Sequence, residues 1–97
     1  MKLGIKVAFD PSFARRRDKE LGAFVEDVMT SYSAIAATKT PRRTGAAAAA
    51  WHTQGSGTRT EAVNMKPYIQ RLDEGYSKQA PRGITKPTTK EIRRKYR

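Results

Sequence analysis

The stretch "LGAFVEDVMTSYSAIA", residues 21 to 36, decides the fold, because its apolar residues recur at intervals of three and four. That spacing places them on one stripe of an α-helix. The members of the stripe are Leu21, Phe24, Val25, Val28, Met29, Tyr32, Ile35 and Ala36. Most nearby charged residues, such as Lys19, Glu20 and Glu26, fall elsewhere. The pattern predicts a long amphipathic helix with one face against a core.

Signals on both sides set the limits of this helix. Upstream, Asp10 is suited to the N-cap and Pro11 to the first helical position, where no N–H is needed. Downstream, Pro41 disfavours the α conformation at the residue before it. We therefore expect a helix over roughly residues 11 to 38. Within it, Gly22 is unfavourable by about 1 kcal/mol relative to alanine.

Two further regions predict β-structure. Residues 3 to 9, "LGIKVAF", alternate large apolar residues with small or charged ones, which is typical of a half-buried strand. The run Gly55-Ser56-Gly57 lies between two segments suited to extended structure, so we expect a β-hairpin over about residues 48 to 65. The five alanines at 46 to 50 stay ambiguous, because alanine favours helix but so short a run is unstable alone.

The remainder is predicted to be mostly irregular. The segment "YIQRLDEG", residues 68 to 75, indicates a short helical turn that ends at Gly75. Residues 76 to 87 carry prolines and a glycine, which predicts a loop. The last stretch, "TTKEIRRKYR", suits a terminal helix capped by Thr88, although Ile92 and Tyr96 are its only apolar anchors.

Together these signals predict an α+β fold, with one long amphipathic N-terminal helix packed on a small antiparallel β-sheet and a short second helical turn. We expect one domain over residues 1 to 84 and a basic C-terminal arm over residues 85 to 97. A chain of 97 residues fits a single domain with a modest core.

Composition narrows the class of protein. Without cysteine, the chain has no disulfide and no cysteine-based metal site. No apolar run approaches the roughly 20 residues that a membrane span needs, and the N-terminus lacks the apolar region of a signal peptide. We expect a soluble protein that is made inside the cell and has no membrane partner.

The formal net charge of +11 is concentrated near the C-terminus. From residue 82 to 97 there are seven basic residues and one acid, Glu91, whereas residues 10 to 39 carry five of each. Such a segment favours an anionic partner, either nucleic acid or an acidic protein surface, and a solvated tail is the plain alternative. Nucleic-acid contact would be directed at the backbone, because no base-reading motif is present. The predicted contacts are Arg82, Lys86, Lys90, Arg93, Arg94, Lys95 and Arg97, with Tyr96 as the one aromatic among them.

No residues carry a sign of catalysis. Asp73 and Glu74 are adjacent, so on a helical turn their side chains diverge by about 100° instead of converging on one substrate. His52 is the only histidine, has no acid at ligand spacing, and is expected at the surface or in an interface. The glycines around Ser56 lack the Lys-Ser/Thr ending of a phosphate-binding loop. We therefore predict no catalytic, cofactor-binding or metal-binding residue.

Two ordered motifs resemble a known family. The first is "TKTPRRTGAAAAAW", residues 38 to 51, and the second is "NMKPYIQRLDEGYSKQAPRG", residues 64 to 83. In this order and spacing they resemble the tail-completion, or head–tail joining (neck), proteins of long-tailed double-stranded DNA bacteriophages. The resemblance covers roughly residues 10 to 84. The matching positions are Thr40, Pro41, Thr44, Gly45, Asn64, Pro67, Tyr68, Leu72, Gly75, Ser77, Gln79, Ala80, Pro81 and Gly83.

The resemblance implies a structural protein of the virion, made in the host cytoplasm, whose subunits form a ring of six or a multiple of six. Such a ring would lie between the head-closure and tail-terminator rings and surround the DNA channel, where non-specific DNA contact is expected. The implied subunit-interface residues are Tyr68, Leu72, Glu74, Gly75, Gln79, Pro81, Gly83, Thr44 and Gly45. This chain departs from the family pattern at Arg42-Arg43, which replaces Val-Asp and inverts the charge of the turn, at the alanine run, and in a shorter, more basic C-terminus.

Two other hypotheses stand beside this one. A small basic nucleic-acid-binding accessory protein would bind any duplex in a salt-sensitive way through residues 85 to 97. A small nuclease, toxin or other enzyme would require His52 or Glu74 for turnover.

Overall fold

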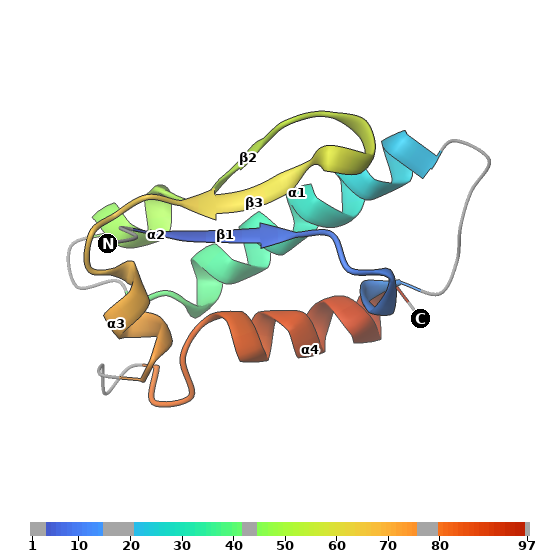
Figure 1. Ribbon diagram of the computed structural model, residues 1–97. Coiled ribbons are helices and arrows are strands. Elements are labelled where there is room, and N and C mark those ends of the chain that lie inside the picture. Colours follow the sequence, from blue (N-terminus) through green and yellow to red (C-terminus); the bar gives the residue numbers. More distant parts are fainter. Residues whose placement is uncertain (1–3, 15–20, 42–44, 76–79, 97) are drawn as a thin grey trace.

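The computed structural model describes residues 4–14, 21–41, 45–75 and 80–96. It is a small α+β fold in which a three-stranded antiparallel sheet and a C-terminal helix pack on one long helix (Figure 1). The strands are β1 (Ile5–Ala8), β2 (His52–Gln54) and β3 (Glu61–Asn64), and the α-helices are α1 (Leu21–Lys39), α2 (Ala46–Ala49), α3 (Ile69–Asp73) and α4 (Thr85–Lys95). Short 3-10 turns lie at η1 (Pro11–Phe13) and η2 (Gly57–Arg59).

The sheet has the order β1-β3-β2, so the hairpin partner β3 occupies the centre. Val7 lies opposite Ala62, and Thr53 lies opposite Ala62 on the other side. The predicted strand near the N-terminus and the predicted hairpin are both confirmed, with strands that are shorter than expected. The run of alanines, which the pattern left ambiguous, forms the single turn α2.

The long helix does not begin near Pro11 as predicted, and its described part runs from Leu21 to Lys39. Asp10 does act as an N-cap, and its carboxylate accepts a hydrogen bond from the Ser12 N–H at 2.9 Å, but the helix that it caps is only the turn η1. Ala14 is then extended, and Phe13 is buried in the core. A strand is therefore the first element of the described chain, and the prediction of an N-terminal helix was wrong in its position.

Most residues of the apolar stripe form the core as expected, whereas Leu21 is exposed. Val25, Val28, Met29, Tyr32 and Ala36 are buried on α1, together with side chains from every other layer. The structure also explains why a glycine stands at position 22 of the helix, because a Cβ there would lie 3.2 Å from the Cα of Gly57 in η2. The helix and the hairpin loop approach each other closely at this point.

The C-terminal segment forms a packed helix and not an arm. Thr88 and Ile92 on α4 are fully buried, and Tyr32 of α1 donates or accepts a hydrogen bond with Thr89 at 3.1 Å. The ring of Tyr32 also stacks on Phe13 at 5.6 Å, and burial raises the pKa of the Tyr32 hydroxyl. Helix α4 is thus part of the fold, which extends past residue 84.

Two local features explain why α4 begins earlier than the terminal helix that the sequence suggested. The helix starts at Thr85 and not at Thr88, because a remote carboxylate caps it, as described below. Pro87 lies in its first turn, where a missing N–H is tolerated, so this proline does not break the helix.

Candidate functional site

The second family-like motif closes a tight corner, which we call the aspartate corner (Asp73, Gly75, Pro81, Gly83 and Thr85). The Asp73 carboxylate accepts hydrogen bonds from the backbone N–H groups of Ile84 at 2.9 Å and Thr85 at 2.7 Å. The Thr85 hydroxyl donates to the same carboxylate at 2.9 Å. A side chain from the end of α3 therefore satisfies the first N–H groups of α4 and places negative charge at its N-terminus.

Backbone segments approach each other closely across this corner. A Cβ at Gly83 would overlap the Asp73 carbonyl oxygen, and a Cβ at Gly75 would lie 2.5 Å from the Pro81 carbonyl oxygen. Both glycines have positive φ, at +84° and +90°. These positions admit only glycine, both for conformation and for space.

The two adjacent carboxylates have different environments. Asp73 is committed to the cap of α4, whereas Glu74 is exposed. Both residues line one groove with Arg82, where Asp73 is engaged by the backbone of α4 and Glu74 faces solvent. The geometry assigns Asp73 a structural role.

The first motif forms a second corner, which we call the tryptophan corner (Thr40, Gly45, Ala47, Trp51 and Asn64). The indole N–H of Trp51 donates to the Thr40 hydroxyl at 2.8 Å, and that hydroxyl donates to the Ala36 carbonyl at 2.8 Å. The Asn64 amide donates to the Ala47 carbonyl at 2.8 Å. Because Asn64 begins the second motif, this buried hydrogen bond joins the two motifs directly.

The residues predicted to form a subunit interface fall into two groups. Tyr68, Glu74 and Pro81 are exposed and are available to a neighbouring molecule. Leu72 packs against the core, while Gly75, Gly83 and Gly45 shape the backbone of the two corners. Thr44 and Gln79 lie outside the described residues.

The exposed apolar side chains add two surface residues that sequence reasoning missed, Leu21 and Met65. Among the described residues, the large apolar side chains on the surface are Leu21, Met65 and Tyr68, which are 39%, 51% and 42% exposed. Met65 and Tyr68 lie between β3 and α3, and Leu21 is the first residue of α1. Figure 1 places these elements at opposite ends of the molecule, whose longest extent is 41 Å. Met65 directly follows β3 and was included in the predicted hairpin, but no pattern indicated its exposure.

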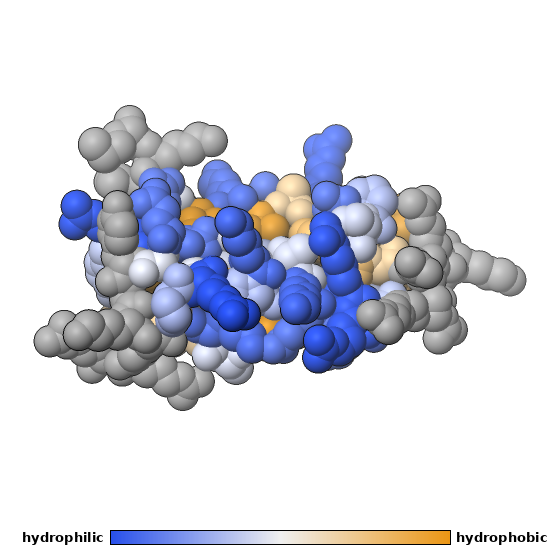
Figure 2. Space-filling model, turned by 90° about the horizontal axis from the view of Figure 1, so that it is seen from below, coloured by the Kyte–Doolittle hydropathy of each residue, from blue (hydrophilic) through white to orange (hydrophobic). Residues whose placement is uncertain are grey.

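Four of the seven basic residues that were predicted to contact an anionic partner lie together in the structure. Lys86, Lys90, Arg93 and Arg94 are all exposed on α4 and line a groove of about 660 Å³ with Ser12 and Thr89. Figure 2, which views the molecule from the side of α4, shows hydrophilic side chains standing over this helix. Arg82 lines a neighbouring groove together with Asp73, Glu74 and Lys86. Lys95 lies away from the first groove, with its Nζ 3.3 Å from the Ser31 hydroxyl, and Arg97 lies outside the described residues.

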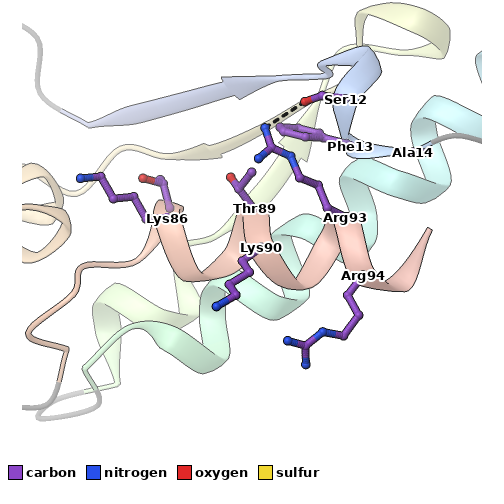
Figure 3. A pocket seen from close by; sticks show the side chains of 9 residues that line it. Ser12, Phe13, Ala14, Lys86, Thr89, Lys90, Arg93 and Arg94 are labelled. Carbon is purple, nitrogen blue, oxygen red and sulfur yellow. Dashed lines mark hydrogen bonds between the residues drawn. The ribbon is translucent and has the colours of Figure 1, made fainter. Parts of the chain in front are cut away.

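The four cations of the groove have few internal partners. Arg93 donates to the Ser12 hydroxyl at 3.0 Å (Figure 3), and within the described part of the chain no carboxylate forms an ion pair with any of the four. The one acid of α4, Glu91, is instead paired with Lys39 of α1. Hydrogen bonds from Ser12, followed by the charge of Arg93, lower the pKa of Asp10.

The aromatic residue near these cations is partly engaged by the fold. The Tyr96 ring packs edge-on against Phe24 at 5.9 Å, and its hydroxyl is 2.8 Å from the Ser31 hydroxyl. Contact between Tyr96 and an anionic partner stays a prediction.

The described residues form no arrangement that suits a metal site or a membrane span, and His52 lies at the surface. His52 is exposed, as expected, with Nδ1 3.0 Å from the Ala50 carbonyl oxygen. No three histidine, aspartate or glutamate side chains of the described residues gather in a way that suits a metal ion. None of the described helices combines the length and the apolar character that crossing a membrane requires.

The chain matches no model of a known protein family, no characterised protein and no solved structure closely enough to indicate a relationship.

Proposed function

We propose that this chain is a structural protein of a bacteriophage neck or tail-completion ring, which joins the head-side connector to the tail around the DNA channel. In this proposal the subunit is made in the host cytoplasm and becomes part of the virion, between the head-closure and tail-terminator rings. The resemblance of the two ordered motifs motivates it, and it implies a ring of six subunits or a multiple of six.

One observation carries the proposal. The two motifs, 17 residues apart at Ala47 and Asn64, meet through the buried Asn64–Ala47 hydrogen bond. The motif residues that are buried or glycine build two rigid corners, while Tyr68 and Pro81 of the same motif face solvent. A motif of this kind is better suited to presenting a fixed surface to a neighbouring subunit than to moving protons.

The distribution of exposed apolar side chains supports a head-to-tail contact. In Figure 1 the described start of α1, which Leu21 belongs to, and the segment between β3 and α3, which contains Met65 and Tyr68, lie at opposite ends of the molecule. Contact between two different surfaces is heterologous, and repetition of such a contact gives a ring when the rotation closes. Burial of these side chains between subunits would also enlarge the modest core of a chain this short.

The test uses the absence of native cysteine. A Leu21→Cys/Met65→Cys double variant is expected to form disulfides between subunits, with a ladder of oligomers on a non-reducing gel that ends at one closed species. Light scattering and negative-stain microscopy of the wild type are expected to show rings at high concentration and moderate salt.

The two single-cysteine variants are the matched controls. In a heterologous contact neither variant forms a disulfide with copies of itself, and a mixture of the two stops at a dimer. A double variant that gives no ladder, together with a wild type that stays monomeric at every concentration, would contradict the proposed ring. Dimers from either single variant alone would indicate a two-fold contact and would equally contradict it.

A further inference from the structure

We infer that the outer face of α4 is a binding surface for the phosphate backbone of double-stranded nucleic acid, with Lys86, Lys90 and Arg94 as its principal contacts. The inference rests on the charge and geometry of α4 and does not depend on ring formation.

The helical geometry gathers these cations. Lys86, Lys90 and Arg94 succeed one another at intervals of four residues, so they lie along one side of the helix about 6 Å apart. Figure 3 shows Lys90 and Arg94 pointing away from the fold on the same side, while Arg93 turns toward Ser12. The opposite side of α4 carries Thr88 and Ile92, which are buried.

The environment leaves the cations available. Asp73 is engaged by α4 backbone groups and Glu91 by Lys39. The exposed Glu74 lines the neighbouring groove with Lys86 and Lys90, but within the described residues it forms no ion pair with either of them. Three exposed cations without carboxylate partners form a local excess of positive charge, which attracts a polyanion.

The other groups of the groove favour nucleic acid over an acidic protein. Its polar lining consists of cations and the hydroxyls of Ser12, Thr85 and Thr89, which are the groups that contact phosphate and sugar. Phe13 and Ala14 also line it, but they are only 5% and 4% exposed. The face therefore lacks the accessible apolar anchors at the centre of a protein–protein interface.

The groove lining also favours binding of a duplex over a single strand, and binding that does not depend on base sequence. Single-strand binding draws on exposed aromatic rings that stack on bases, and the Tyr96 ring is packed against Phe24. The groove carries no asparagine or glutamine, which recognise adenine, and its lysines and arginines can contact phosphate groups as well as guanine. We therefore assign its contact to the nucleic-acid backbone.

The test measures binding of a short, labelled DNA duplex of mixed sequence by fluorescence anisotropy over a range of salt concentrations. The variant is Lys90→Gln/Arg94→Gln, and the control is Lys6→Gln/Arg59→Gln. The control removes the same two charges from the formal +11, at exposed positions on β1 and η2. Circular dichroism checks that both variants stay folded.

We expect the α4 variant to bind about 50-fold more weakly near 0.1 M salt, with the slope of log K against log salt reduced by about 2. The control should change affinity less than about threefold. Equal losses in the two variants would show an effect of net charge alone and overturn the inference, as would a wild type that does not bind the duplex.

Two further ligands separate the alternatives. Tighter binding of poly-glutamate than of the duplex, lost in the α4 variant, would assign the face to an acidic protein instead. Tighter binding of a single strand of the same length would contradict the duplex. Failure of the cysteine ladder leaves these outcomes unchanged, so the two proposals fail independently.

Discussion

The aspartate corner and the tryptophan corner both belong to the family-like motifs, but different interactions hold them. The tryptophan corner depends on buried side-chain hydrogen bonds, from Trp51 to Thr40 and from Asn64 to Ala47. The aspartate corner depends on backbone segments that touch at Gly75 and Gly83, and on one carboxylate that caps a helix.

The difference is clearest at the glycines. Gly45 and Gly83 have nearly the same positive φ, +78° and +84°. A Cβ at Gly83 would overlap backbone, whereas a Cβ at Gly45 would meet nothing within 4 Å among its surroundings. Two glycines with the same conformation therefore differ in what a side chain would cost, and this difference can be measured.

The largest effect is expected for Gly83→Ala. The new Cβ meets the Asp73 carbonyl oxygen, and an alanine with positive φ is itself strained, so we expect a loss of about 3 kcal/mol or more in the free energy of unfolding. Urea denaturation followed by circular dichroism measures it. A loss below about 1 kcal/mol would mean that the corner relaxes easily and is not rigid.

The cap is expected to give the second effect. Asp73→Ala removes the acceptor for two backbone N–H groups and the Thr85 hydroxyl, which should destabilise the fold by about 2 to 3 kcal/mol. Asp73→Asn, which keeps one acceptor oxygen, should recover part of that loss.

The matched control for the cap is Glu74→Gln, because Glu74 is adjacent but exposed. We expect a change within about 0.5 kcal/mol by the same urea measurement. Equal losses at the two positions would show that net acidity, and not the cap, stabilises α4.

The tryptophan corner supplies the third effect. Thr40→Val keeps the shape but leaves the buried Trp51 N–H without its acceptor, so we expect a loss of about 1.5 kcal/mol. Trp51 is the only tryptophan, so its fluorescence emission should report the lost hydrogen bond directly. Thr38→Val, at an exposed position of α1, is the control, and an unchanged spectrum in Thr40→Val would contradict this account.

The elements with local signals could be predicted from the sequence. The apolar stripe of α1, the hairpin glycines and the Gly75 stop are contained in short windows, and each has its expected counterpart. The start of α1 was misplaced because Asp10-Pro11 caps a 3-10 turn in the same way as it would cap a longer helix.

The start of helix α4 and its place in the core could not be predicted, because its support is remote in sequence. Its cap comes from Asp73, and its anchors Thr88 and Ile92 are buried against other elements. The basic residues of α4 were identified from the sequence. Only the structure of the helix shows that Lys90 and Arg94 line the groove, whereas Lys95 lies near Ser31. The predicted interface residues fall into buried and exposed groups for a related reason. A sequence motif does not distinguish glycines that shape a corner from side chains that face solvent.

The smallest effect, expected for Gly45→Ala, completes the comparison of the two corners. An alanine with positive φ costs about 1 to 2 kcal/mol, and the reduced freedom of the unfolded chain offsets about half of this, so we expect a net loss below about 1 kcal/mol. Gly45→Asn should cost less still, because asparagine adopts this conformation more readily. Urea denaturation beside Gly83→Ala gives the difference directly. Since φ is nearly equal at the two sites, that difference isolates the backbone contact at Gly83; equal losses would show that conformation alone, and not close approach, explains both glycines.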